Sequence, residues 1–224
     1  MEIFHSLVLL LQQGIDIVLH LDVHLNEWIT HFGSMTYAIL FAIFFAETGL
    51  VVLPFLPGDS LLFALGALSA GDGAFLQFPI LIPTLLIAVF LGDNVNYFVG
   101  RTVGLQLFRD PKSKLFRKEY LDRTEKFYSK HGGKMVILAR FAPILRTFSP
   151  FVAGMAKMSY RQFIAYSVGG SVTWVGLFLG AGYFFGNIPA VKSNFHIVIV
   201  AIILISALPA LMEAWKLRCE SRAA

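Results

Sequence analysis

The chain has 224 residues, of which 57% are hydrophobic and 14% are charged, and its mean hydropathy is +0.71. This balance is too apolar for a soluble domain of this length and indicates a polytopic membrane protein. All 18 Lys and Arg residues lie after residue 100, whereas the first 100 residues contain eight acidic side chains and no basic one. Because basic residues collect on the cytoplasmic side of membrane proteins, residues 101–134 and the C-terminal tail are predicted to be cytoplasmic.

Residue content also argues against several classes of function. The single cysteine, Cys219, excludes an internal disulfide and a cysteine metal cluster. His20, His24 and His31 lack supporting ligands at metal-binding spacing, so neither a metal nor a cofactor is expected. The basic residues flank apolar spans and match no nucleic-acid-binding module, so no nucleic-acid partner is expected. The motifs of intramembrane proteases and lipid phosphatases are missing, and the chain is not expected to be an enzyme.

The N-terminal third is predicted to form an interfacial helix followed by a re-entrant hairpin. Residues 1–30 alternate apolar and polar faces at helical spacing, which predicts an amphipathic interfacial helix; a helix that crosses the membrane is the alternative. The segment 35–71 is apolar around Glu47 and is then broken, and only about 12 residues follow the break, roughly 18 Å of helix. We interpret it as a re-entrant hairpin, the alternative being a transmembrane helix followed by a surface helix. Its predicted helix breaks are Pro54, Pro57 and Gly58.

The remaining elements repeat this pattern in the opposite orientation. The segment 135–160 again has prolines between short apolar legs, and its predicted breaks are Pro143 and Pro150. The other predicted elements are transmembrane helices at 79–100, 162–186 and 195–215, the cytoplasmic basic segment at 101–134, and a cytoplasmic tail at 216–224. The whole chain, 1–224, is thus predicted to be one all-α integral membrane domain. It is an inverted repeat of a re-entrant helical hairpin plus a transmembrane helix, with an N-terminal amphipathic helix and an extra C-terminal transmembrane helix.

Four ionisable side chains lie inside the predicted hairpins: Glu47, Asp59, Arg140 and Arg146. An ionised group in hydrocarbon costs about 3 kcal/mol or more, so such residues face a cavity or one another. The planar guanidinium suits phosphate, which predicts that the arginines bind an anion and that the carboxylates accept protons. Salt bridges that only hold the hairpins together are the alternative. A break at Pro143 would let both arginines converge, since six residues of unbroken helix would turn them about 240° apart.

A further polar group closes the first predicted transmembrane helix. It consists of Asp93, Asn94 and Asn96. These side chains either line the same cavity or cap the helix at the cytoplasmic interface, and we favour the cap.

Three ordered motifs resemble the hallmarks of the DedA family, over about residues 35 to 212. They read "ETGLVVLPFLPGDSLL", "GDNVNYFVGRTVG" and "RFAPILRTFSPFVAGMAKMSY". The resemblance implies a multi-pass protein of the bacterial inner (cytoplasmic) membrane with opposed re-entrant hairpins, related to eukaryotic lipid scramblases of the VTT-domain group. It implies that the functional acidic and basic residues are Glu47, Asp59, Arg140 and Arg146. It further implies the return of undecaprenyl phosphate from the outer to the inner leaflet.

Three hypotheses follow for the function. The first is a lipid transporter that moves the phosphate head of undecaprenyl phosphate, or of another anionic phospholipid, through a polar cavity, with protons as coupled ions. The second is a proton-coupled exporter of a small solute that affects membrane potential and drug resistance. The third is a structural or assembly protein. No pattern in the sequence indicates an oligomeric state.

Overall fold

The computed structural model describes residues 21–50, 58–71, 74–104, 133–206 and 208, and all regular structure in these residues is helical. The helices in chain order are α2 (Leu21–Phe32), α3 (Met35–Gly49), α4 (Gly58–Leu68), α5 (Phe78–Val99), the π-helical turn η1 (Gly100–Gly104), α8 (Lys134–Ala139), α9 (Pro143–Met155), α10 (Tyr160–Phe185), α11 (Pro189–Lys192) and an apolar helix at Phe195–Ser206.

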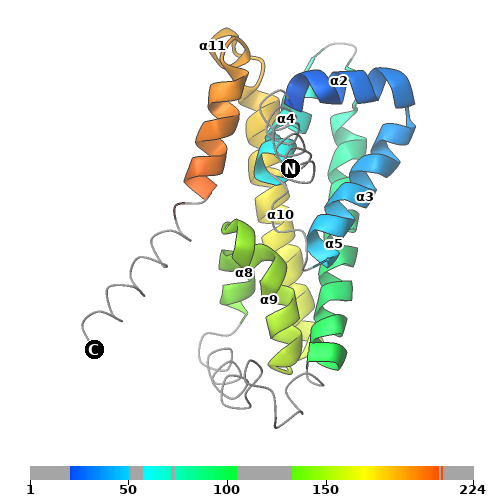
Figure 1. The fold of residues 1–224 in the computed structure, drawn as a ribbon, viewed down its shortest axis with the longest axis vertical. Helices are drawn as coiled ribbons and strands as arrows, with labels where there is room; N and C mark the ends of the chain where they lie inside the picture. Colours follow the sequence, from blue (N-terminus) through cyan, green and yellow to red (C-terminus); the bar gives the residue numbers. More distant parts are fainter. Residues whose placement is uncertain (1–20, 51–57, 72–73, 105–132, 207, 209–224) are drawn as a thin grey trace, which may run out of the picture.

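Two long helices form the body of the molecule. Helices α5 and α10 run along its long axis from one end to the other (Figure 1). Together with η1, α5 has 27 residues, and its most apolar stretch of 18 residues has a mean hydropathy of 1.8. Helix α10 has 26 residues, and the corresponding value is 1.4. At 1.5 Å per residue each covers about 40 Å, more than the roughly 30 Å of a bilayer's hydrocarbon core. Both lie within two residues of the segments that the sequence predicted to span.

The short helices pack against opposite halves of these two long ones. Helix α4 lies in the upper half of the view and packs mainly on α10, whereas α8 and α9 lie in the lower half and α9 packs on α5 (Figure 1). Both crossings are made close by glycine. A Cβ at Gly182 of α10 would meet backbone atoms of Phe63 in α4, and a Cβ at Gly154 of α9 would meet backbone atoms of Tyr97 in α5. Backbones can therefore approach more closely here than side chains would permit.

The helix breaks differ in part from the predicted ones. The chain leaves helical form at Arg140–Ala142, and Pro143 is the first residue of α9, where its missing N–H is not needed. Pro150 was predicted to be a break, which is wrong, because it lies inside α9. An interior proline removes one hydrogen bond, and the ladder continues on either side of it. Gly58 begins α4. Pro54 and Pro57 lie outside the described residues.

Several predicted elements are described only in part. Of the N-terminal segment 1–30, the residues from Leu21 onward form α2. Of the last predicted transmembrane helix, Phe195–Ser206 is helical. Most of the basic segment 101–134, and the tail 216–224, fall outside the described residues.

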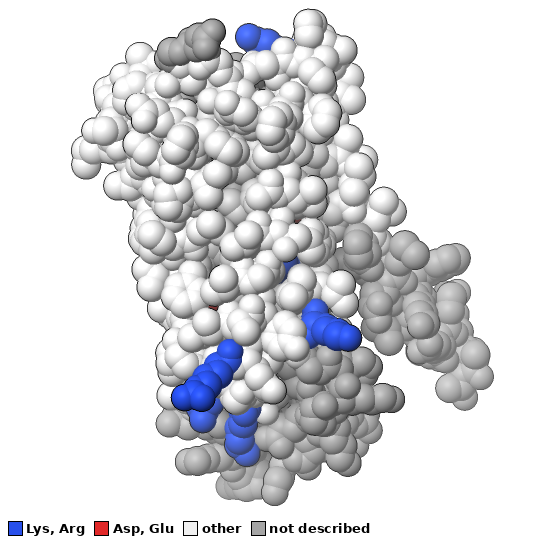
Figure 2. Space-filling view, turned by 180° about the vertical axis from the view of Figure 1, so that it is seen from behind, with Lys and Arg blue, Asp and Glu red and all other residues white. Residues whose placement is uncertain are grey.

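The surface between the two ends carries almost no charged side chain in the face shown in Figure 2. Basic side chains gather toward the lower end, with one at the top. On α5, Ile87, Leu91 and Val95 follow one another at four-residue spacing and are 53%, 41% and 42% exposed. An apolar stripe of this kind on a long helix is typical of contact with lipid.

Candidate functional site: two buried arginine clusters

The first cluster surrounds Arg146, which is 3% exposed in the first turns of α9. Its Nη1 donates to Oδ1 of Asp59 at 2.7 Å, and its Nη2 donates to Oε1 of Glu47. Trp174 of α10 holds both partners: its indole Nε1 donates to the same Asp59 oxygen at 2.8 Å, and its ring centroid lies 4.5 Å from the guanidinium carbon of Arg146. A cation over a buried indole gains about 2 kcal/mol. We call Glu47, Asp59, Arg146 and Trp174 the Arg146 cluster.

The backbone around this cluster helps to stabilise its buried carboxylates. Asp59 is the second residue of α4, where the N-terminal end of the helix stabilises an anion. The carboxylate of Glu47, near the end of α3, lies directly over Gly58. Since Arg146 comes from the first turns of α9, side chains from the N-terminal turns of two short helices meet at this point.

The second cluster surrounds Arg140, which follows α8 and is 2% exposed. Its Nη2 donates to Oδ2 of Asp93, in α5, and lies 3.2 Å from the hydroxyl of Ser167, in α10. The Ser167 hydroxyl in turn donates to the same Asp93 oxygen at 2.5 Å. Asp93 is 1% exposed and Ser167 is fully buried. We call Asp93, Arg140 and Ser167 the Arg140 cluster.

Both clusters contain buried polar atoms that form no hydrogen bond with other described residues. Nε and Nη1 of Arg140, Nε of Arg146 and Oε2 of Glu47 have no hydrogen-bond partner in the part of the chain that the structure describes. A buried donor without a partner costs about 1–3 kcal/mol. These arginine edges are therefore suited to bind an oxyanion or water.

The structure divides the predicted group of four ionisable residues. Arg146 binds both Glu47 and Asp59, while Arg140 binds Asp93 instead. The preference for Asp93 as an interfacial cap is wrong, because its carboxylate is buried against Arg140. Two buried arginines each need a carboxylate partner, and this requirement could have identified Asp93 from the sequence.

The neighbouring amides tie helices together instead of entering the Arg140 cluster. Asn94 accepts a hydrogen bond from the hydroxyl of Tyr160 at 2.6 Å. Asn96 donates to the carbonyl oxygens of Thr48 and Thr147, at 3.1 and 2.5 Å. They join α5 to α10, α3 and α9.

Two residues of the clusters were missed by reasoning from sequence. Ser167 looks like any small residue of a membrane helix, so nothing marked it. Trp174 lies in the middle of α10, whereas tryptophans of membrane helices favour the interfaces, and this unusual depth was a usable signal.

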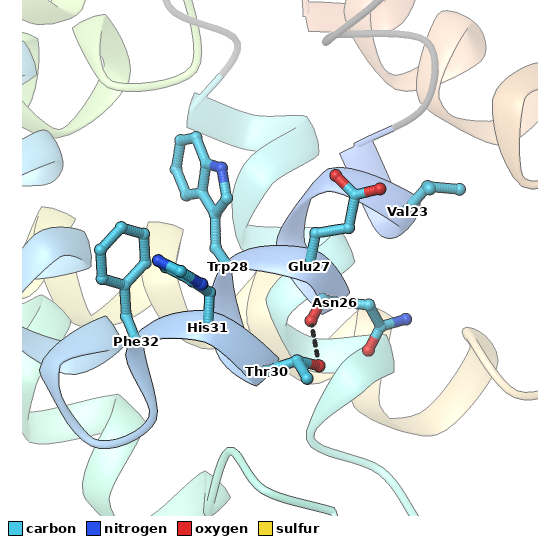
Figure 3. A pocket seen from close by; sticks show the side chains of 7 residues that line it. All are labelled: Val23, Asn26, Glu27, Trp28, Thr30, His31 and Phe32. Carbon is cyan, nitrogen blue, oxygen red and sulfur yellow. Dashed lines mark hydrogen bonds between the residues drawn. The ribbon is translucent and has the colours of Figure 1, made fainter.

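Two surface hollows lined by described residues lie away from both clusters. The larger is a groove along α2, and Figure 3 shows side chains of this one helix spreading around it. Its lining residues are Val23, Asn26, Glu27, Trp28, Thr30, His31 and Phe32. A smaller hollow lies between α2, the end of α4 and the residues around Asn187. Neither of these two hollows contains a residue of the two clusters, whose side chains are buried among the described residues.

The described residues form only helices, two of them of spanning length, with exposed apolar side chains and charges buried in pairs. These features are those of a membrane protein with a polar interior. Residues 56–184 match the VTT domain. The chain is 57% identical to protein DedA of Escherichia coli (strain K12) over 199 residues, which cover 89% of this chain and 91% of the relative. It therefore belongs to the DedA family of VTT-domain membrane proteins, as the three motifs predicted.

More distant relatives agree with this assignment. A membrane protein of Mycobacterium leprae is 41% identical over 201 residues, 88% of this chain and 89% of the relative. Inner membrane protein YqjA of Escherichia coli (strain K12) is 30% identical over 196 residues, 84% of this chain and 88% of the relative. These names support a place in a bacterial inner membrane. No solved structure matches the chain.

Proposed function

We propose that the chain is a lipid transporter of the bacterial inner membrane that moves undecaprenyl phosphate between leaflets. The phosphate head passes between two opposed re-entrant hairpins, α3 with α4 and α8 with α9, while the polyprenyl tail stays in lipid. The observation that carries the proposal is a pair of buried arginines, Arg140 and Arg146, each with N–H donors that no other described residue of this membrane protein pairs. Arginine donors in this setting suit a phosphate group, because they keep their charge and can bind two oxygens at once.

The helix ends support an anion as the transported group. The Arg146 cluster joins side chains from the N-terminal turns of α4 and α9, and the N-terminal end of a helix is the positive pole of its dipole. Broken membrane helices whose N-terminal ends converge are a recurring way to hold an anionic substrate near the midplane. Helix α4, at 11 residues, covers about 16 Å, which supports a hairpin over a spanning helix.

The charge balance of the Arg146 cluster supports coupling to protons. One arginine faces two carboxylates, Glu47 and Asp59, so the fully ionised cluster carries one excess negative charge. A buried excess charge is unfavourable, and one proton shared by the carboxylates removes it. An incoming phosphate also needs the carboxylates to release Arg146, and protonation weakens their hold. Uptake of a proton and binding of the anion thus favour each other at one place.

The basic end of the molecule sets the proposed orientation. Exposed basic side chains of the described residues include Arg101 in η1, Lys157 in the turn after α9 and Arg161 in the first turn of α10. These elements lie together at the lower end of the molecule (Figure 1). By the positive-inside rule we assign this end, and the C-terminal tail, to the cytoplasm.

The test is transport in liposomes that contain the purified full chain. Undecaprenyl phosphate should exchange between leaflets faster than in empty liposomes, and Arg146→Lys should reduce the rate toward that of empty liposomes. Arg161→Lys, the same change at an exposed arginine of α10, is the matched control and should keep the wild-type rate. A wild-type rate equal to that of empty liposomes would refute lipid transport. A wild-type rate in Arg146→Lys would show that charge alone suffices at this position and that paired donors are not needed.

A further inference from the structure

The two arginine clusters lie at two separate positions along α10. Trp174 belongs to the Arg146 cluster and Ser167 to the Arg140 cluster, and the two residues are seven positions apart. At 1.5 Å per residue they lie about 10 Å apart along the helix axis. Ser167 is the nearer of the two to Tyr160, the first residue of α10, and therefore to the basic end of the molecule.

Within the Arg140 cluster, only one nitrogen of the guanidinium, Nη2, donates hydrogen bonds to other described residues. One oxygen of Asp93, Oδ2, accepts from both Arg140 Nη2 and the Ser167 hydroxyl. The ion pair between Arg140 and Asp93 is therefore not bidentate, and Nη1 and Nε of Arg140 have no partner among the described residues. A phosphate group has three terminal oxygens. It could accept from Nη2, from a second N–H and from the serine hydroxyl together, which a single carboxylate oxygen does not do.

Gly170 of α10 lets the helix backbone pack closely against Arg140. A Cβ at Gly170 would lie 2.8 Å from Nε and 2.9 Å from Cδ of Arg140, so any side chain there would push Arg140 away. Glycine at this position thus lets α10 pack closely against Arg140 without displacing its guanidinium. At Gly169, the preceding residue, a Cβ would meet nothing within 4 Å. The close approach is therefore specific to the face of α10 that carries Ser167.

The charge balance differs between the two clusters. The Arg140 cluster has one arginine and one carboxylate, whereas the Arg146 cluster has one arginine and two. An anion that reaches Arg140 has a single carboxylate, Asp93, to displace. The Arg140 cluster is thus the place where competition between the protein's own carboxylate and a bound anion is simplest.

We propose that the Arg140 cluster is a second binding station for the phosphate group, in which the phosphate takes the place of Asp93 on Arg140 and accepts a hydrogen bond from Ser167. The proposal rests on the proposed function for the phosphate as substrate, and it adds Asp93 as the displaced counter-ion and Ser167 as a ligand. The anion passes between the Arg146 cluster and this station along α10, and the station lies on the side of the basic end.

The test measures binding to the purified full chain in detergent micelles, through the rise in melting temperature that a ligand produces. The probe is farnesyl phosphate, with farnesol and inorganic phosphate as separate arms. Asp93→Asn removes the competing carboxylate, so the half-saturating concentration of farnesyl phosphate should fall about tenfold or more, or 1.4 kcal/mol. The double variant Asp93→Asn with Arg140→Gln should lose this gain. An unchanged half-saturating concentration in Asp93→Asn, or a gain that survives in the double variant, would overturn the station.

The other arms identify the source of the phosphate. A gain with farnesyl phosphate alone assigns the station to a lipid-borne phosphate, and an equal gain with inorganic phosphate assigns it to the free ion. A gain with farnesol shows binding of the tail and refutes the proposal. If Asp93→Asn does not fold, Gly170→Ala replaces it and should weaken binding, while its matched control Gly169→Ala should not; equal binding by these two variants refutes the station. Micelles have no leaflets, so a failure of transport in liposomes and a failure of binding here are separate results.

Discussion

Replacing Gly182 with alanine should force α10 away from α4. A Cβ at this position would lie 2.8 Å from the carbonyl carbon of Phe63 and 3.0 Å from the backbone nitrogen of Ala67, and closer still to the carbonyl oxygen of Phe63. These are backbone atoms of a helix, so they cannot rotate away as a side chain would. The two helices must separate, and the fully buried Leu62 and Leu179 lose part of their packing. Overpacking of this kind costs about 1–3 kcal/mol of the free energy of unfolding.

The matched control is Gly180→Ala, two residues earlier in the same helix. A Cβ there would meet nothing within 4 Å, so the only effect is the helix propensity of alanine, worth about 1 kcal/mol in favour of folding. The two variants should therefore differ by about 2–4 kcal/mol. For a chain of this size that is a difference of about 4–16 °C in melting temperature.

The assay is a melting curve of each purified variant in the same detergent, followed by the fraction that remains monodisperse after heating. Equal melting temperatures for Gly182→Ala and Gly180→Ala would show that α4 and α10 are not in contact as described. Because Asp59 in α4 binds Trp174 in α10, a separated interface should also reduce transport in Gly182→Ala.

Three further predictions concern charge and topology. Arg140→Lys should insert normally and lose most lipid transport, because lysine keeps the charge without the paired donors; a wild-type rate would show that charge alone suffices. Glu47→Gln combined with Asp59→Asn should make transport slow and nearly independent of pH between about 6 and 8, since no titrating carboxylate remains at Arg146. A wild-type pH profile in that variant, with insertion and melting checked alongside, would move proton coupling to Asp93. Accessibility tags at the C-terminus and within residues 112–134 should report the cytoplasm, and a tag within residues 72–78 the outside; a cytoplasmic report for the last would contradict the first re-entrant hairpin.

The long helices could be predicted from sequence because their cause is local. A run of more than 20 apolar residues must cross a bilayer, and the ends of α5 and α10 fall where polar or helix-breaking residues begin. The break before Pro143 was predictable for the same reason, since the residue before a proline disfavours helix. Pro150 shows the limit of this reasoning, because a proline inside a helix costs a hydrogen bond that packing can offset.

The pairing of the buried charges could not be predicted, because it depends on contacts between distant segments. Asp93 and Arg140 are 47 positions apart, and Asp59 and Trp174 are 115 apart. Four charged residues in two hairpins allow several pairings, and the hydrophobic pattern is the same for each. The pairing is decided by which short helix packs on which long one. That packing depends on glycines that allow close approach of two backbones, and this role can be recognised only when the opposing backbone is known.

The glycine crossings restrict how a phosphate group could pass through this fold. Helix α4 packs on α10 and helix α9 packs on α5, so each short helix is held by a different long one, and both crossings bring backbones together. Arg146 of α9 in turn binds Asp59 of α4, which joins the two crossings through one ion pair. Sliding either short helix along its partner would drive backbone against backbone at Gly182 or Gly154. The parts that can exchange partners at low cost are therefore the side chains, and passage by successive replacement of Glu47, Asp59 and Asp93 on the two arginines needs no such sliding.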